Sequence, residues 1–269
     1  MKKILFVPDT ISSGESGARS ASQTVKILFK MGYDIGIYGS DAKKYNNKNV
    51  SLYNRKPFRM VQHFLSYKIK KEFYNVVKSF NPDFLFFAGG TINKPLAFYQ
   101  LCIQKKIPFV FIDYCSSYFC IKTFSGLSNG PCVKCINGNF FPALINKCSM
   151  SNRPNINWLL STIVLSRFRS ILKYTHGAIG YSDSQLRLYN KYGIPKSKLF
   201  KTSIFINPDT IKRRGKKDNL NENYFFIYGQ QRKIKGWHLL NEIFQNCENI
   251  KFKIAIQDGL KTESIINKW

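Results

Sequence analysis

Five of the seven cysteines lie in one short part of the chain, with the spacing Cys115-x4-Cys120-x11-Cys132-x2-Cys135-x12-Cys148. A Cys-x-x-Cys turn directs two sulfurs toward one point, as in structural zinc sites with tetrahedral thiolate ligands. Two further ligands could come from Cys115, Cys120 or Cys148, and the set that we predict is Cys120, Cys132, Cys135 and Cys148. The alternative is that all of them are reduced, partly buried thiols. The segment therefore predicts either a structural zinc site or a group of free thiols.

A loop near the N-terminus has residue types suited to binding phosphate. It contains Gly14 and Gly17 and connects an apolar strand to a helix. Backbone N–H groups and the helix dipole favour an anion at such a junction. The loop matches neither the dinucleotide-binding fingerprint nor the P-loop, and glycines also occur in such turns for conformational reasons alone.

A basic turn near the C-terminus is a second candidate for binding phosphate. Gly229 ends an apolar strand, and Arg232 and Lys235 follow before a predicted helix. Open α/β sheets bind ligands at the carboxyl ends of their strands. Two cations at this edge suit a diphosphate, whose developing charge they would neutralise if it leaves during group transfer. The alternative is that these are ordinary surface cations of a basic protein.

The elements that must position these residues alternate between strand and helix. Apolar runs without alternation predict strands buried on both faces, and 3.6-residue periodicity predicts the helices between them. The order implies an α/β protein with parallel sheets and right-handed crossovers. We expect strands at 3–7, 33–38, 84–88, 109–112, 177–181, 224–228 and 251–256, and helices at 21–30, 59–80, 93–105, 157–174 and 237–246.

Charge is the most unusual bulk property of the chain. Its 269 residues hold 42 Lys and Arg against 15 Asp and Glu, a net charge of +27, and no nucleic-acid-binding motif is recognisable. Part of the excess is explained by a composition rich in Lys, Asn and Ile. The helix at 59–80 interleaves apolar residues with lysines, so it either lies on an anionic membrane or packs its apolar stripe on a sheet. The apolar run at 4–7 is too short for a signal peptide, and no run is long enough to span a bilayer, which predicts a cytoplasmic protein.

Several motifs, taken in order, resemble those of family 4 (group 1) glycosyltransferases of the GT-B fold. The segment around Cys132 and Cys135 resembles the cysteine insert of a subset that builds bacterial surface polysaccharides, including lipopolysaccharide. The other matching segments are the N-terminal strand with its loop (8–17), Pro82-Asp83-Phe84-Leu85, the strand at 108–114, Ala178-Ile179-Gly180-Tyr181-Ser182, Tyr192-Gly193-Ile194-Pro195, Phe205-Ile206-Asn207-Pro208-Asp209 and the turn at 227–236.

The resemblance implies a retaining hexosyltransferase that moves a sugar from a nucleotide-sugar to a lipid-linked or polysaccharide acceptor. It implies no metal for the chemistry, and a location in the cytoplasm or at the inner face of the cell membrane. Asp113 is the predicted catalytic residue. Gly14, Gly17, Gly229, Arg232 and Lys235 would bind the donor. No nucleic-acid partner is expected.

The predicted domains are an acceptor-side Rossmann-like domain at 1–206 with the cysteine-rich insert at 113–155, a linker at 207–223, and an incomplete donor-binding domain at 224–269. The chain departs from the family pattern in several places. Gln230 stands where the family has an arginine, and Ile112 where it has a histidine. The Glu-x7-Glu element of the donor domain is not found before Trp269. We therefore expect a truncated glycosyltransferase or one completed by another chain. The alternative is a non-catalytic remnant that binds an acceptor or a partner protein.

Overall fold

The computed structural model describes most of the chain in two separate units. Contacts divide it into Met1–Pro208 and Asp209–Trp269. The boundary falls at the start of the predicted linker at 207–223, which lies outside the described residues. The described residues are 1–12, 16–47, 49–56, 67–90, 93–114, 120, 126–127, 130–146, 148, 156–203, 224–229, 239–246 and 251–256.

The first unit is built on a seven-stranded sheet in which every neighbouring pair is parallel. The strand order is β3-β2-β1-β4-β5-β8-β9, so the chain starts in the middle of the sheet, runs to one edge and then crosses to the other. This order is Rossmann-like and confirms the predicted parallel α/β architecture. The strands are β1 (Lys3–Pro8), β2 (Asp34–Gly39), β3 (Ser51–Asn54), β4 (Phe84–Ala88), β5 (Phe109–Ile112), β8 (Gly177–Gly180) and β9 (Leu199–Lys201).

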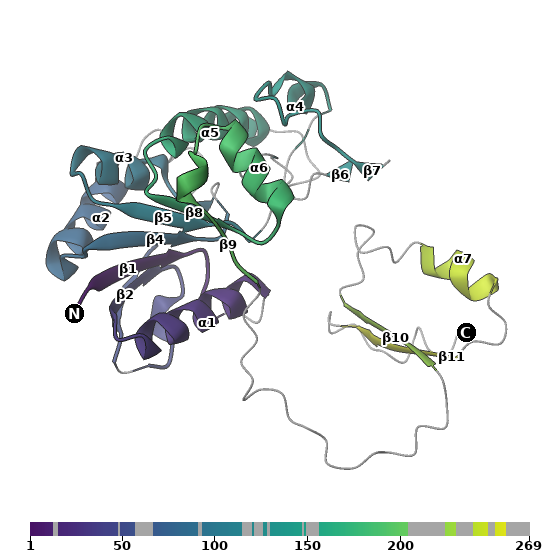
Figure 1. Cartoon of the computed structure of the whole chain (residues 1–269), viewed down its shortest axis with the longest axis horizontal. Helices are drawn as coiled ribbons and strands as arrows, with labels where there is room; N and C mark the ends of the chain where they lie inside the picture. The colour runs from purple at the N-terminus through teal and green to yellow at the C-terminus, as the bar shows by residue number, and fades with distance from the viewer. Residues whose placement is uncertain are drawn as a thin grey trace, which may run out of the picture. The chain divides into compact units, whose positions relative to one another are not determined.

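Helices cover both faces of this sheet, but unequally. The longer helices are α1 (Ser16–Lys30), α2 (Tyr67–Phe80), α3 (Leu96–Gln104), α5 (Ile156–Leu172) and α6 (Asp183–Lys191). Helix α1 lies on one face, and α2, α3, α5 and α6 lie on the other (Figure 1). Two short 3-10 helices, Ala42–Lys44 and Lys196–Lys198, complete the connections. Successive strand residues such as Ile4 and Leu5 point to opposite faces and enter two separate apolar clusters.

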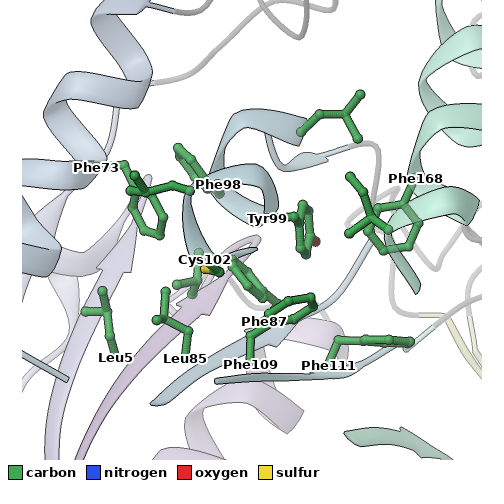
Figure 2. Close-up of a cluster of buried hydrophobic side chains, with 14 of the residues drawn as sticks. Leu5, Phe73, Leu85, Phe87, Phe98, Tyr99, Cys102, Phe109, Phe111 and Phe168 are labelled. Atoms are coloured by element: carbon green, nitrogen blue, oxygen red, sulfur yellow. The ribbon is translucent and has the colours of Figure 1, made fainter. Parts of the chain in front are cut away.

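The larger of the two clusters is aromatic (Figure 2). Phe73 of α2 stacks on Phe98 of α3 with ring centroids 4.0 Å apart. Tyr99 packs against Phe87 at 4.3 Å and meets Phe168 of α5 edge to face at 4.9 Å. Each fully buried side chain of this size stabilises the fold by roughly 1.5–3 kcal/mol. These rings join α2, α3 and α5 to the sheet, which supports the strand ends described below.

The apolar stripe of helix α2 is buried inside the protein. Phe73, Val77 and Phe80 are buried in the aromatic cluster, and Ile69 and Val76 pack against it. Of the two interpretations of the basic amphipathic helix, packing on the sheet is the one that the structure shows. The stripe within Tyr67–Phe80 is therefore not available to lipid. The first part of the predicted helix, at 59–66, lies outside the described residues.

Two edge strands of the large sheet and several helix boundaries differ from the sequence prediction. β3 and β9 were not predicted, because both are short, carry polar residues and lie at the sheet edges, where burial leaves little trace in the sequence. α1 begins at Ser16 rather than at residue 21, so Gly17 lies in its first turn. No helix among the described residues has both the length and the apolar character needed to cross a membrane.

The described part of the cysteine-rich insert is small and rests on α5. It contains the two-residue antiparallel strands β6 (Gly126–Leu127) and β7 (Gly130–Pro131) and the helix α4 (Phe141–Ile145). The Arg169 guanidinium of α5 lies 4.3 Å from the Phe140 ring centroid and 4.1 Å from that of Tyr192. It also donates a 3.0 Å hydrogen bond to the Cys135 carbonyl oxygen. Arg169 thus fastens the insert to the first unit.

The second unit shows one parallel strand pair and a helix among its described residues. The strands are β10 (Tyr224–Gly229) and β11 (Lys251–Ile256), and the helix is α7 (Leu240–Gln245). Phe225 and Phe226 are 62% and 64% exposed, although successive strand residues point to opposite faces. Within the described part of this unit, both faces of the strand pair therefore carry exposed phenylalanine.

Candidate functional site at the carboxyl edge of the sheet

The carboxyl ends of the parallel strands in the first unit bring polar residues from distant parts of the sequence together. Open α/β sheets bind ligands at this edge, because the loops and helix N-termini converge there. Asp9 follows β1, Asp41 follows β2 and Arg55 follows β3. Lys94 lies in the connection after β4, and Asp113 follows β5. Five strands thus each contribute a charged residue to one edge.

Asp9 is the centre of this group. Its carboxylate accepts hydrogen bonds from the backbone N–H of Gly90 at 2.6 Å and from Asn93 Nδ2 at 3.0 Å. It also forms an ion pair with the ammonium group of Lys94. One carboxylate therefore ties the end of β1 to the connection between β4 and α3.

Gly89 makes this close approach feasible. Its φ of +101° is in the left-handed region, and a Cβ at this position would collide with the Asp9 carboxylate. Only glycine satisfies both conditions without strain. The Gly89-Gly90 pair after β4 therefore allows the backbone to pass close to the Asp9 carboxylate.

Lys94 is a deeply buried charged side chain of the site. Its side chain is only 1% exposed, whereas that of Asp9 is 25% exposed. Burial lowers the pKa of Lys94, and the neighbouring Asp9 opposes this shift. A buried ammonium is tolerated only when it is paired and hydrogen-bonded, and Lys94 Nζ also lies 3.3 Å from the carbonyl oxygen of Gly90. The lysine is thus an internal counterion that fixes Asp9.

Arg55 extends the network toward β2 and β3. It is 6% exposed, and its guanidinium donates a 3.1 Å hydrogen bond to the carbonyl oxygen of Asn93. Burial lowers its pKa, while Asp9 and Tyr38 oppose the shift. Burial in turn raises the pKa of Tyr38 to about 12, so this phenol stays neutral beside the cation at physiological pH. The buried positive charges of Arg55 and Lys94 therefore both interact electrostatically with Asp9.

Asp41 shapes the start of the glycine-bearing loop. Its carboxylate accepts hydrogen bonds from the backbone N–H of Ile11 at 2.9 Å and of Ser12 at 2.8 Å. Ser40 Oγ donates a 3.1 Å hydrogen bond to the carbonyl oxygen of Asp9. The backbone from Asp9 to Ser12 is thus held before the chain enters α1, whose first turn contains no acidic residue. A helix N-terminus at this edge favours negative charge nearby.

Asp113, the predicted catalytic residue, is fully buried behind the edge rather than exposed on it. Its backbone carbonyl accepts a 3.1 Å hydrogen bond from Gln185 Nε2 of α6. Its charge acts on Lys94, Tyr99 and Tyr181, which places its carboxylate among them. Asp113 therefore belongs to the charged network beneath the loops.

Two stacked tyrosines line the edge beside this network. The rings of Tyr114, after β5, and Tyr181, after β8, are 6.2 Å apart between centroids and inclined by 27°. A Cβ at Gly17 would lie 3.6 Å from the Tyr114 ring, so α1 approaches this pair closely. Burial is the main cause that raises the pKa of both tyrosines, to about 12 for Tyr181. Aromatic faces beside a few fixed polar groups are typical of small-molecule binding sites.

The other predicted donor-site residues lie in the second unit or outside the described residues. Gly229 is the last residue of β10 in the second unit. Gly14, Arg232 and Lys235 lie outside the described residues. Of the predicted donor-binding residues, Gly17 alone lies in the described part of the first unit, in the first turn of α1.

The four predicted metal ligands, Cys120, Cys132, Cys135 and Cys148, form no disulfide in the structure. Cys135 packs against the small cluster that contains Cys148. Among the described residues, no three His, Cys, Asp or Glu side chains are already arranged to hold a metal ion.

Sequence analysis missed Asp9, Lys94 and Arg55. Asp9 had a usable signal, because it directly follows the first buried strand at the expected carboxyl edge. Lys94 and Arg55 had no usable signal in the sequence, because in a chain with 42 lysines and arginines each of them is expected to lie on the surface. Their role depends on burial, which only the three-dimensional arrangement reveals.

Several solved structures share the fold of this chain. The chain is similar to Anabaena Alr3699/HepE in complex with UDP and glucose, with a TM-score of 0.55 and 12% identity, over 94% of this chain and 60% of that one. It is similar to Acinetobacter baumannii MurG, with a TM-score of 0.51 and 12% identity, over 100% and 62% of the two chains. It is also similar to the UDP-GlcNAc 2-epimerase of Neisseria meningitidis bound to UDP-GlcNAc, with a TM-score of 0.52 and 14% identity, over 99% and 68%.

These likenesses concern the fold, because the identities are low. No protein-family model and no curated protein matches the sequence. The chain spans 62% of the MurG chain. The predicted fold class is confirmed: the chain has the GT-B-like fold of glycosyltransferases and nucleotide-sugar epimerases, with one Rossmann-like domain and part of a second.

Proposed function

We propose that the chain is a retaining glycosyltransferase that moves a sugar from a nucleotide-sugar to a lipid-linked or surface-polysaccharide acceptor. The observation that carries the proposal is the carboxyl edge of the first unit, where a buried ionic network holds the loops of a GT-B-like sheet in place. Structures of the same fold contain UDP with glucose or UDP-GlcNAc. The sequence motifs that resemble family 4 support transfer with retention.

In this proposal the carboxyl edge of the first unit receives the acceptor. Asp9, Ser12 and Asn93 offer polar groups at or near the surface, and the Tyr114–Tyr181 pair offers an aromatic wall. Holding two reactants in a fixed geometry is a large part of enzymatic rate enhancement, so loops with immobilised backbones are an advantage here. The buried residues Arg55, Lys94 and Asp113 beneath them position the edge and are not expected to touch the sugar.

The donor diphosphate is assigned to the basic turn of the second unit. Arg232 and Lys235 follow Gly229, the last residue of β10. Two cations beside a diphosphate neutralise the negative charge that develops when the nucleotide leaves. This step needs no metal if the cations supply the charge. Gly14 and Gly17, before and within the first turn of α1, are assigned to the donor phosphate or the acceptor from the first unit.

Contact of α2 with an anionic membrane surface is proposed as electrostatic and without insertion. The apolar stripe of α2 is buried, but Lys68, Lys71 and Lys78 are exposed. With a net charge of +27, the chain is attracted to anionic lipid, and each lysine near the surface contributes about 1 kcal/mol. Flotation with phosphatidylglycerol vesicles should therefore show salt-sensitive binding, and equal binding to phosphatidylcholine vesicles would contradict it.

The test of the function is turnover of a nucleotide-sugar panel by the full chain. With UDP-glucose, UDP-GlcNAc and their GDP and ADP counterparts, we expect slow release of the nucleoside diphosphate, accelerated by polyprenyl-linked acceptors. The variant Arg232→Ala/Lys235→Ala should lose release, and the matched variant Lys216→Ala/Lys217→Ala in the basic linker should keep it. Interconversion of UDP-GlcNAc to its 2-epimer, with no transfer, would identify an epimerase instead.

A non-catalytic acceptor- or partner-binding protein is the second candidate. It is favoured by the exposed Phe225 and Phe226 on the described strand pair of the second unit. It predicts binding of acceptor without turnover of any donor. Acceptor binding together with an inert donor panel would establish this candidate and overturn the enzyme.

A further inference from the structure

The outer face of α5 exposes apolar side chains. Leu159 is 41% exposed, and Ile163, four residues later, is 37% exposed. Residues four apart in a helix lie on the same face, so the two side chains are neighbours. The other side of α5 is buried in the aromatic cluster through Val164 and Phe168. Helix α5 therefore has two apolar sides, of which one lies in the core and the other is exposed.

Helix α4 carries a second exposed apolar pair. Phe141 and Ile145 are 61% and 64% exposed. Another side of α4 packs on α5, because Phe140 and Ala143 share a small cluster with Leu165 of α5. Two helices in contact thus both expose large apolar side chains. Exposed apolar side chains that gather in this way mark a site of interaction with a protein or a membrane.

The charged residues in this part of the chain are all cations. The sequence has no Asp or Glu between Asp113 and Asp183, whereas the same stretch contains seven Lys and Arg residues. They are Lys122, Lys134, Lys147, Arg153, Arg167, Arg169 and Lys173. Lys134, Arg167 and Lys173 are exposed in the structure. An apolar face flanked by cations complements an anionic membrane, where apolar side chains enter the boundary between headgroups and acyl chains.

We propose that the outer faces of α4 and α5 form a docking surface that holds the first unit on an anionic membrane. The apolar side chains enter the interface, and the cations pair with lipid phosphates. This contact differs from that of α2, whose apolar stripe is buried and whose lysines supply attraction alone. A second copy of the chain is a poorer occupant, because its own net charge of +27 opposes the cations of this surface.

The docking surface lies beside the carboxyl edge of the sheet. The insert begins after the carboxyl end of β5, and α5 leads from the insert back to the start of β8. The first half of α5, which contains Leu159 and Ile163, is therefore the half nearest the edge to which the acceptor is assigned. Docking presents this edge to acceptors anchored in lipid. Only this last consequence rests on the proposed function, since membrane docking is measured without donor or acceptor.

The first experiment measures flotation of the full wild-type chain with phosphatidylglycerol vesicles at rising salt. At about 0.5 M NaCl, exposed charges are screened over a few ångström, so attraction by lysines alone would be lost. We expect the wild type to keep at least about a tenth of its low-salt partition coefficient, because salt does not screen the burial of apolar side chains. Complete loss of binding at this salt would overturn the proposal.

The second experiment replaces the apolar side chains. Leu159→Ser/Ile163→Ser should bind the same vesicles at least about tenfold more weakly, because two apolar side chains no longer leave water on binding. The matched control is Phe29→Ser/Met31→Ser, at the end of α1, where the side chains are 38% and 65% exposed. This control should bind like the wild type. Equal binding by the two variants would overturn the proposal.

A third variant tests α4 and a second copy of the chain as the occupant. Phe141→Ser/Ile145→Ser should also weaken vesicle binding, and sedimentation without lipid should show monomers for this variant and for the wild type. A wild-type dimer that the variant abolishes, with unchanged vesicle binding, would assign the surface to a second copy and overturn the proposal. If a variant does not fold, the salt series on the wild type still decides.

Discussion

The Asp9–Lys94 ion pair should behave asymmetrically when either partner is replaced. Lys94 is 1% exposed, so Asp9→Asn leaves a buried ammonium without its counterion. Asp9 is 25% exposed and keeps the hydrogen bonds from Gly90 and Asn93, so Lys94→Met leaves a carboxylate that is still solvated. The burial of the two partners therefore predicts which replacement costs more.

The expected magnitudes follow from this difference in burial. Asp9→Asn should destabilise the protein by about 3–5 kcal/mol, the usual cost of an uncompensated buried charge. Lys94→Met should cost about 1–2 kcal/mol, since what it loses is one hydrogen-bonded partner. The double variant should be more stable than Asp9→Asn alone, because methionine removes the charge that asparagine left unpaired. For a unit of this size, 3 kcal/mol corresponds to a fall in Tm of about 6–12 °C.

The assay is thermal and urea unfolding of the full chain and its three variants, followed by far-UV circular dichroism. The four free energies of unfolding form a double-mutant cycle, and we expect non-additivity of about 2 kcal/mol. Equal costs of the two single replacements would contradict the reasoning. So would a double variant whose cost equals the sum of the single costs, since the two residues would then act independently.

Three further replacements test other parts of the account, each by its free energy of unfolding. Gly89→Ala should destabilise the protein by more than about 2 kcal/mol, and Gly193→Ala by about 1 kcal/mol. Both glycines have a positive φ, but only at Gly89 would a Cβ collide with a neighbour. Equal costs would rule out the close packing of Gly89 on Asp9. Phe73→Ala should destabilise the protein by about 3–5 kcal/mol and Lys71→Ala by less than about 0.5 kcal/mol, because only Phe73 lies in the core. Similar costs would mean that α2 does not pack on the sheet. Ser182→Ala should cost about 1 kcal/mol, because the Ser182 hydroxyl caps α6; a neutral replacement would disprove the cap.

The parallel sheet was predictable because its central strands are continuous apolar runs. The stretch 84–88, for example, has no polar residue and can only be buried on both faces. β3 and β9 left no such signal, because edge strands are short and half exposed. The amphipathic pattern of α2 was equally compatible with a membrane and with a sheet. Periodicity identifies an apolar face, but it does not say what covers that face.

The site was predictable only in its location. The glycine-bearing loop after the first strand indicated this edge, and the family resemblance added Asp113. The central role of Asp9 and the burial of Lys94 depend on contacts between residues more than eighty positions apart. In a chain with so many basic residues, the sequence does not distinguish the few buried cations from the many exposed ones.

Binding of the nucleotide part of the donor is the most direct test of the central claim. Isothermal titration of the full chain with UDP, GDP and ADP measures it without the need to know the sugar or the acceptor. We predict one-to-one binding of at least one of these nucleotides, weakened at least about tenfold in Arg232→Ala/Lys235→Ala by loss of the charge-assisted contacts, and retained in Lys216→Ala/Lys217→Ala. Absence of binding for all three nucleotides, or equal binding by both variants, would contradict the assignment of a nucleotide-sugar site to this chain.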